Sequence, residues 1–384
     1  MAITTTLAAC SQIANNNGPD GTVDPPGSLD DAIRASLSFI AILRDTKANI
    51  ASPTFTGTTT VASLAFNDGT KLGTSASLAK PNLVLNGNFD VWQAGTLLAS
   101  GTGARYLADQ WQHNSGGSTY TASQQSYVVG QTAVPNEPQF FNRSVVTSVA
   151  GVGNFALLVQ TIENVRNYAG KTVTLSFYAK ADTAKNIAIE YVQGFGSGGT
   201  PSAAVGSIGV TTIALTTAFQ KFTIITAIPS ISGKVIGTTD FTSSTQLVFW
   251  FDAGSNFNTR TNSLGQQSGT FDISQVWIEE GSVSTTFPLR AYGQELGFCQ
   301  RYYEIGNGRV DAYNIAANLI SFLYPFKITK RITPTVTLSN SGYGNASGAV
   351  IDPTITTAAC ELTAVVTATG SAAFATTITA DARF

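Results

Sequence analysis

The sequence predicts a mainly β protein, and three observations carry that prediction. From about residue 81 onward the chain is a series of short segments rich in Val, Ile, Thr, Phe and Tyr, separated by Gly, Asn, Ser and Pro. No helical periodicity of useful length interrupts the first and longer part of this series. Charged residues make up only 11% of the 384 residues, whereas hydrophobic residues make up 43%. A surface that is polar but uncharged is typical of sheet-rich proteins found outside cells or in virions.

The bulk properties exclude several classes of protein. A net charge of −2 gives no electrostatic footprint for nucleic acid. No run of about 18 apolar residues predicts a membrane span. The N-terminal MAITTTLAACSQIANNN lacks a basic region followed by an apolar one, so we expect no signal peptide. Cys10, Cys299 and Cys360 are scattered, which argues against a disulfide framework or a zinc site and predicts buried or idle thiols.

The first two segments predict an arm and a helix. Residues 1–27 are small and polar and end in GPDGTVDPPG, which predicts an extended arm closed by a Pro-Pro break. Residues 28–52 predict a helix with acidic residues in its first turn. Its apolar positions follow a heptad seam: Leu29, Ile33, Ile40 and Leu43. The helix packs on a neighbouring part of its own chain, or it associates with copies of itself through a seam whose register the polar Ser36 and Lys47 would set.

A β neck is predicted for residues 53–80. Pro53 stops the helix, Gly57 permits a tight turn, and TTTVASLAF alternates well enough for one strand. Such a strand has too few large apolar side chains to be stable alone. Three identical chains could each contribute one strand to a shared core, so we expect a homotrimer.

Two β units follow the neck. The repeated β patterns of residues 81–298 predict a β-sandwich of jelly-roll type. The predicted strands lie near residues 83–92, 105–113, 118–129, 139–147, 154–163, 171–180, 186–194, 203–216, 219–228, 245–252 and 270–279. Residues 299–384 restart the pattern with ITPTVTLS, CELTAVVTATG and AAFATTITADARF, which predicts a smaller, distal β-sandwich domain. Its richness in Thr, Ala and Val suggests thin strands that share a core across subunits.

Three strands suggest a binding face. In VTLSFYAKAD, LVFWFDAG and QVWIEEG, aliphatic residues alternate with an aromatic residue and a charged residue on the opposite face. If these faces converge, they form a glycan-binding platform made of Tyr178, Lys180, Trp250, Asp252, Trp277 and Glu279. Two other interpretations stay open, because the aromatic residues could instead pack against a neighbouring subunit or within the chain. Tyr343, in the polar segment SNSGYGNASGAV, is either a further glycan-binding residue in a loop or part of an ordinary hairpin loop.

The sequence offers little for catalysis. His113 is the only histidine, so a metal site would have no second imidazole ligand, and we expect His113 at the surface or in a turn. The motifs GxSxG and HExxH and a phosphate-binding loop are absent. Although a cross-strand pair of carboxylates could hydrolyse glycosides, we expect no enzyme.

Three segments together resemble bacteriophage tail fibre or receptor-binding proteins. SPTFTG resembles a short repeat of their necks, and DPPGSLDDAIRASLSFIAILRD resembles a virion-proximal segment near their N-termini. WIEEGSVSTTFPLRAYGQELGFCQRYYE resembles the junction that follows their carbohydrate-binding jelly rolls, and it is the most specific of the three. At 384 residues the chain is short for a long fibre, which favours a stubby fibre or spike.

The resemblance implies a non-enzymatic homotrimer in the virion tail, present in the host cytoplasm during assembly. Residues 1–27 would be a virion-attachment arm that binds a tail or baseplate protein, and the distal part would bind a host surface polysaccharide or lipopolysaccharide. The rival interpretation is a structural tail or baseplate spacer that binds no receptor. Analogy with carbohydrate-binding jelly rolls also suggests a structural calcium ion, for which Asn88, Asp90 and Asp272 supply hard oxygen ligands, and no other cofactor is expected.

Overall fold

The computed structural model describes residues 63–65, 71–73, 82–351 and 355–384. Strands make up 51% of the described residues and helices 5%, which confirms the prediction of a mainly β fold. The chain divides into two units, residues 1–74 and 75–384, which are described separately.

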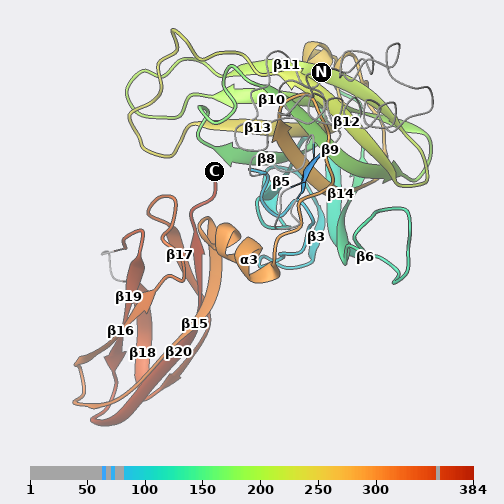
Figure 1. The fold of residues 1–384 in the computed structure, drawn as a ribbon. Coiled ribbons are helices and arrows are strands. Elements are labelled where there is room, and N and C mark those ends of the chain that lie inside the picture. Colours follow the sequence, from blue (N-terminus) through green and yellow to red (C-terminus); the bar gives the residue numbers. More distant parts are fainter. Residues whose placement is uncertain (1–62, 66–70, 74–81, 352–354) are drawn as a thin grey trace, which may run out of the picture. The chain divides into compact units, whose positions relative to one another are not determined.

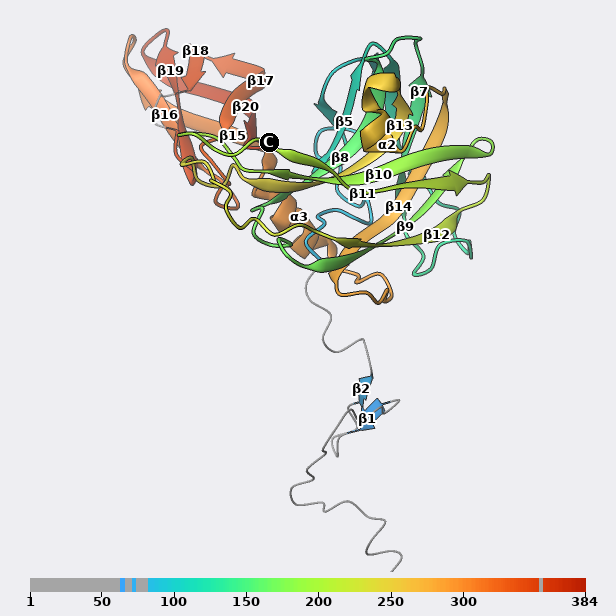
Figure 2. The same cartoon turned by 90° about the horizontal axis from the view of Figure 1, so that it is seen from above.

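The described part of the first unit is one antiparallel hairpin. Strand β1 (Ser63–Ala65) pairs with strand β2 (Lys71–Gly73), both labelled in Figure 2, with Leu64 opposite Leu72. Strand β1 falls within the predicted neck strand TTTVASLAF. The arm, the predicted helix with its seam of Leu29, Ile33, Ile40 and Leu43, and most of the neck lie outside the described residues. The homotrimer therefore stays a prediction.

The second unit begins with a sandwich of two six-stranded antiparallel sheets (Figure 1). One sheet has the strand order β11 (Val205–Leu215), β10 (Lys185–Gly194), β13 (Ser244–Ala253), β8 (Phe155–Glu163), β5 (Trp111–Gly116) and β4 (Arg105–Tyr106). The other has the order β12 (Gln220–Ala227), β9 (Thr172–Ala181), β14 (Gly269–Glu280), β7 (Phe140–Thr147), β6 (Thr119–Ser126) and β3 (Leu97–Gly101). Each predicted range from 118–129 to 270–279 matches one of these strands closely.

The hydrophobic core lies between the two sheets. Alternate side chains of both sheets enter it, including Leu175 and Phe177 of β9 and Leu247 and Phe249 of β13, all fully buried. Phe177 meets Phe249 across the core with ring centroids 5.1 Å apart and an edge-to-face angle of 79°. The period of two along each strand thus sends one row of side chains into the core and leaves the next row on the outer face.

The strand predicted near residues 83–92 does not form. Asn86 and Phe89 have positive φ angles of 52° and 57°, so the backbone turns instead of extending. The Asn86 side chain donates to the carbonyl of Val91 and accepts from its N–H, which replaces the hydrogen bonds of a strand. At Gly87 a Cβ would lie 2.1 Å from the carbonyl oxygen of Val276, so only glycine allows the loop to approach β14 this closely. The loop still fills the core, since Phe89 and Val91 are fully buried.

His113 is a core residue, not the surface or turn residue that the sequence suggested. It lies in β5 with 1% of its surface exposed, because the strand continues past Trp111 and alternation directs the side chain inward. Its ring stacks on Tyr120 at 5.3 Å, and Nε2 lies 3.0 Å from the Ser144 hydroxyl. Burial, with a smaller effect of the Arg105 charge, lowers the pKa of His113 to about 3, so the imidazole is neutral.

The C-terminal part of the second unit is a smaller sandwich of two three-stranded sheets. One has the order β15 (Tyr303–Asn314), β20 (Gly370–Asp381) and β17 (Thr335–Gly344), and the other β16 (Leu319–Pro325), β19 (Ala359–Val366) and β18 (Ala346–Ile351). The second β unit predicted from the sequence is therefore present. Leu362, Phe374 and Ile378 are fully buried in a core that the single chain closes, so these strands do not need a neighbouring subunit to hide their apolar faces.

A buried ion pair ties this smaller sandwich to the chain that enters it. Lys330 and Glu304 are both fully buried, and the Lys330 ammonium lies 2.6 Å from the Glu304 carboxylate. Tyr324 and the N–H of Lys327 donate to the same carboxylate. The Glu304 charge is thus satisfied, as a buried charge requires.

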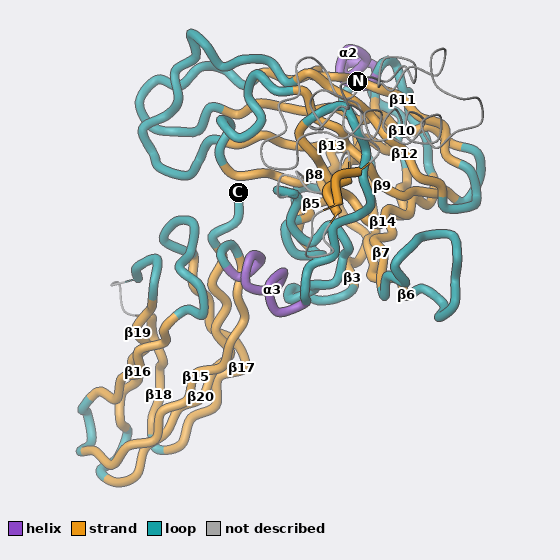
Figure 3. Tube along the Cα trace, viewed as in Figure 1, coloured by secondary structure: helices purple, strands orange, loops and turns teal. Residues whose placement is uncertain are grey.

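A helix that the sequence did not predict joins the two sandwiches. Helix α3 (Tyr292–Gln300), drawn in purple in Figure 3, spans the predicted boundary at residues 298 and 299. The junction also holds Arg331, whose guanidinium donates to the carbonyls of Phe241, Ala382 and Arg383. The Arg331 side chain thus links the segment at Phe241 in the large sandwich to the residues that follow β20.

The two described cysteines are free and buried, as expected. Cys299 lies in α3 and Cys360 in β19, and both are fully buried. Burial raises the pKa of Cys360 to about 11 and that of Cys299 well above its usual value. Cys10 lies outside the described residues.

The remaining helical segments are short. The 3₁₀ turn η4 (Ser255–Phe257) and helix α2 (Asn258–Thr261) follow β13. Within the described ranges, none of the helices has both the length and the apolar character needed to cross a membrane.

Replacing His113 with Gln should reduce the loss of stability in acid. The unfolded imidazole takes up a proton near pH 6.5, whereas the folded one resists protonation down to about pH 3. Below pH 6.5 this group therefore costs the wild-type protein up to about 1.4 kcal/mol of unfolding free energy per pH unit. Urea unfolding of both proteins at pH 7 and pH 4.5 measures the difference. Equal losses of stability in the two proteins would contradict the assignment.

Candidate functional site

The outward direction of the predicted glycan-binding residues in β14 depends on a β-bulge. Gln275 has a positive φ of 43°, and the pairing of β14 with β9 is irregular between Ser274 and Trp277. One extra residue at this point shifts the alternation by one position. Val276 and Ile278 therefore enter the core, whereas Trp277 lies on the outer face of the sheet.

Trp250 forms no shared platform with the other predicted aromatic residues. It lies in β13, in the sheet opposite the one that holds Tyr178 and Trp277. Only 1% of its surface is exposed, because the ring of Phe257 covers it at 5.1 Å. Its indole N–H donates to the fully buried Glu190 carboxylate at 3.0 Å, so both polar groups are paired within the chain. The structure corrects the expectation that the three aromatic faces converge.

Asp252 is fully buried and serves the loops at one end of the sandwich. Its carboxylate accepts hydrogen bonds from the hydroxyls of Ser118 and Ser148 at 2.6 and 2.8 Å. The N–H of Gln267 adds a third bond at 2.7 Å. The carboxylate thus joins the three connecting segments that hold Ser118, Ser148 and Gln267.

Trp277 and Glu279 face outward, but the segment that follows β14 covers them. Trp277 is 1% exposed, with Phe287 edge-on at 5.6 Å and the Lys221 ammonium 4.8 Å from its ring. Its indole N–H donates to Glu279 at 2.9 Å, and the N–H of Thr285 donates to the same oxygen at 2.9 Å. Both residues thus fix the covering segment against the sheet.

Tyr178 and Lys180 lie on the uncovered part of this outer face. They are half-buried residues of β9, and three aromatic residues from other segments gather beside Lys180. We call this group the aromatic face, defined as Tyr127, Phe141, Tyr178, Lys180 and Phe219. The Lys180 ammonium lies 5.0 Å from the ring of Phe219 and 5.9 Å from that of Phe141.

The aromatic face is held by an ion network on the neighbouring strands. Arg143 of β7 donates two hydrogen bonds of 2.8 Å to the Asp272 carboxylate of β14, which is 2% exposed. Lys180 lies 3.6 Å from the same carboxylate. Two cations thus flank one anion, which leaves the face locally positive and fixes Lys180 beside the rings.

A depression adjoins the aromatic face at the connection between β6 and β7. Its volume is about 540 Å³. It is lined by residues 126–130 and 137–140. Val128 and Val129 at its edge are 80% and 95% exposed. The aromatic face therefore borders a recess of the size that small ligands occupy.

The residues predicted for calcium make protein contacts of their own. The Asn88 amide donates to the Asp90 carboxylate at 3.0 Å, and Arg143 takes both oxygens of Asp272. In the described ranges no group of three or more His, Cys, Asp or Glu side chains is arranged to hold a metal. Asn88, Asp90 and Asp272 thus form hydrogen bonds to other protein groups and are not grouped as a calcium site. Calcium binding stays a prediction.

Tyr343 lies in a strand and not in a loop. It is the penultimate residue of β17, pairs with Phe374 of β20, and has 44% of its surface exposed. Asn345, with a positive φ of 51°, is the single residue that joins β17 to β18. The chain therefore passes from one sheet to the other too tightly to form the expected loop.

The sequence pattern does not single out Tyr127, Phe141 and Phe219 as site residues. Phe141 occupies a strand position that reasoning from alternation could have placed on the outer face beside Lys180. Tyr127 and Phe219 lie just outside β6 and β12, in connections where periodicity gives no direction. Their shared position is set by the sheet order, which sequence periodicity does not specify.

Comparisons with known proteins give no family for this chain. No family model and no curated protein match it. A family 11 carbohydrate-binding module from Clostridium thermocellum, solved with a mixed-linked tetrasaccharide, is 15% identical with a TM-score of 0.29, covering 48% of this chain and 99% of that chain. The enzymatically active domain of bacteriophage CBA120 tailspike protein 4 is 16% identical with a TM-score of 0.27, covering 45% of this chain and 19% of that chain.

A xylan-binding domain from Paenibacillus barcinonensis is 10% identical with a TM-score of 0.27, covering 50% of this chain and 97% of that chain. These TM-scores are too low for the similarities to carry an argument about this protein. The resemblance to tail fibre proteins therefore stays a prediction from the sequence.

Replacing Asp272 with Asn should lower the free energy of unfolding by about 2 kcal/mol, because it leaves Arg143 and Lys180 without their shared anion. The value lies below that for a fully buried pair, since the Arg143 side chain is 32% exposed. Urea unfolding measures it. Asp311→Asn is the matched control, because its partner Arg309 is exposed, and it should have no measurable effect. Equal effects of the two variants would contradict the assigned role of Asp272.

Proposed function

We propose that this protein is a non-enzymatic attachment subunit of a bacteriophage tail fibre or spike, and that the aromatic face binds a host surface glycan. The observation that supports this most directly is the grouping of aromatic rings, of which those of Tyr127, Tyr178 and Phe219 are half-buried, with a cation and a recess on one face of a sheet. The tail fibre part of the proposal rests on the sequence resemblance of the neck, the virion-proximal segment and the junction.

The chemistry of the aromatic face suits a sugar ring. The apolar face of a pyranose packs on a flat aromatic ring, and its hydroxyls need planar or charged hydrogen-bonding groups at the edge. Tyr178 and Phe219 supply rings, and Lys180 supplies three N–H donors beside them. Burial raises the pKa of Tyr178, so its phenol stays neutral and can both donate and accept.

The proposed attachment role implies functions for the N-terminal segments of the chain. Residues 1–27 would bind a tail or baseplate protein, and residues 28–52 would bring three copies together. Three weak glycan sites on one assembly gain affinity through their high local concentration. The alternative is a structural spacer of the tail or baseplate, in which the aromatic face contacts a neighbouring subunit and binds no receptor.

The full chain should bind at least one polysaccharide on an array of bacterial surface glycans. Tyr178→Ala and Phe219→Ala should each weaken that binding about tenfold, because each removes one stacking ring. Tyr313→Ala is the control, since this tyrosine of β15 is 79% exposed and lies outside the aromatic face. Absence of binding to every glycan would favour the spacer.

Two further outcomes complete this experiment. Polysaccharide recovered from the binding mixture should keep its length on size-exclusion chromatography, and shortening would show an enzyme. If Tyr178→Ala changes the oligomeric state instead of the affinity, the face is a subunit contact.

The full chain should form a homotrimer in solution, with a mass three times its 40.1 kDa by light scattering. Ile33→Asp with Ile40→Asp should abolish the trimer, because charges at two seam positions would have to be buried. Asp31→Asn, off the seam, is the control. A monomer of wild-type protein would contradict the proposed assembly.

A further inference from the structure

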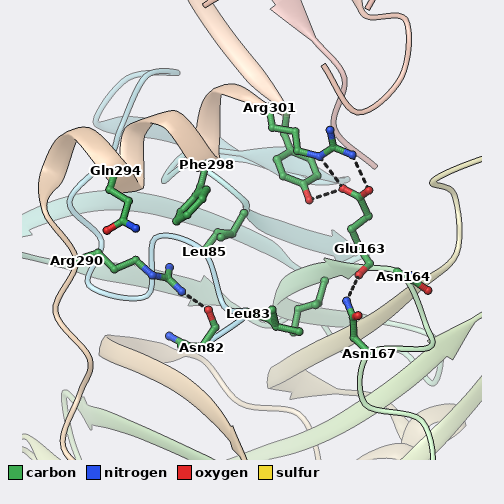
Figure 4. Close-up of a pocket in the computed structure, with 12 residues that line it drawn as sticks. Asn82, Leu83, Leu85, Glu163, Asn164, Asn167, Arg290, Gln294, Phe298 and Arg301 are labelled. Carbon is green, nitrogen blue, oxygen red and sulfur yellow. Dashed lines mark hydrogen bonds and ion pairs between the residues drawn. The ribbon is translucent and has the colours of Figure 1, made fainter. Parts of the chain in front are cut away.

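A second pocket lies away from the aromatic face, beside helix α3 (Figure 4). Its volume is about 470 Å³, within the range of about 300 to 1,000 Å³ that small-molecule sites occupy. Loop 82–85, the end of β8 with the turn after it, and α3 with the segment before it form its walls. The labelled side chains in Figure 4 come from all three walls.

The walls are fixed by ion pairs and hydrogen bonds. Arg290 donates to the carbonyls of Asn82 and Val84, which attaches the start of α3 to the loop. On the other side, Arg301 donates to the Glu163 carboxylate at 2.7 and 3.1 Å. Contacts within the chain thus hold the walls of the pocket in place.

The charges that line the pocket are already compensated. Arg290 pairs with Glu295 at 3.0 Å, and Arg301 pairs with Glu163 at 2.7 Å. Tyr302 donates its hydroxyl to Glu163 at 2.7 Å as well. An anion would compete with these internal carboxylates for the two arginines, so the pocket favours an uncharged ligand.

Primary amides supply the free hydrogen-bonding groups. The Gln294 side chain is exposed and makes no hydrogen bond to a described residue. Asn164 uses its oxygen to accept from the N–H of Arg166, which leaves its amide N–H groups for a ligand. Asn167 donates to the Glu163 carbonyl, which leaves its oxygen as an acceptor. The pocket therefore offers both donors and acceptors.

An apolar wall faces these amides. Phe298 of α3 has 42% of its surface exposed, and the Arg290 guanidinium lies 5.4 Å from its ring. Leu83 and Leu85 are half-buried on the loop. A ligand that fits must be uncharged, rich in hydroxyl groups and apolar on one face.

We propose that this pocket binds one neutral sugar residue, with the ring of Phe298 under its apolar face and the amides on its hydroxyls. The site is separate from the aromatic face and does not depend on it. Because its residues come from the large sandwich and from α3, a bound sugar contacts both, which stabilises the junction that leads to the smaller sandwich.

The test uses the full chain and four probes: the methyl glycosides of glucose, galactose, mannose and N-acetylglucosamine. Saturation-transfer NMR should detect binding of at least one probe with a Kd of about 1 to 10 mM. Phe298→Ala and Gln294→Ala should each weaken this binding at least about fivefold. Gln294 is exposed, so its variant keeps the test valid if Phe298→Ala does not fold.

Tyr292→Ala is the matched control, because this residue is 59% exposed on the same helix and does not line the pocket. Tyr178→Ala tells the two sites apart, because it removes a ring from the aromatic face and leaves the pocket beside α3 intact. Failure of all four probes to bind, or wild-type affinity in both pocket variants, would overturn the proposal. Loss of binding in Tyr178→Ala alone would place the sugar on the aromatic face and also overturn it.

Discussion

The phase of the alternation along strand β14 is the constraint on which the large sandwich depends. This strand is twelve residues long, lies between β9 and β7, and is buried over most of its length. Without the bulge at Gln275, the second half of the strand would direct Trp277 into the core and Ile278 outward. The loop that passes β14 at Gly87 bonds to Val276 at this same point, so the bulge and the loop fix each other.

Charge is scarce in this sequence, and much of it is used inside the fold. Glu190, Asp252 and Glu304 are fully buried, and each is surrounded by donors from its own chain. Such groups gain little net stability, but the loss of one partner leaves a buried charge and is costly. They therefore specify which segments meet.

The positions of most strands could be predicted from the sequence, whereas the residues that gather at the candidate site could not. Strands such as β9 and β13 were predictable because alternation with a period of two leaves a direct trace in the residue order. The loop around Asn86 could not be predicted, because the Asn86 side chain supplies the hydrogen bonds that a strand would make. Helix α3 could not be predicted, because its nine residues do not present one continuous apolar stripe. Alternation predicts that Trp250 lies on the face opposite the core, as observed. The residues near Trp250 in the sequence do not indicate that Phe257 covers it.

The two buried cysteines have a consequence for the chemical durability of the protein. A thiol reacts with oxidants and alkylating agents as the thiolate, and burial holds Cys299 and Cys360 in the protonated form. These side chains therefore stay unmodified when the surroundings change from reducing to aerated.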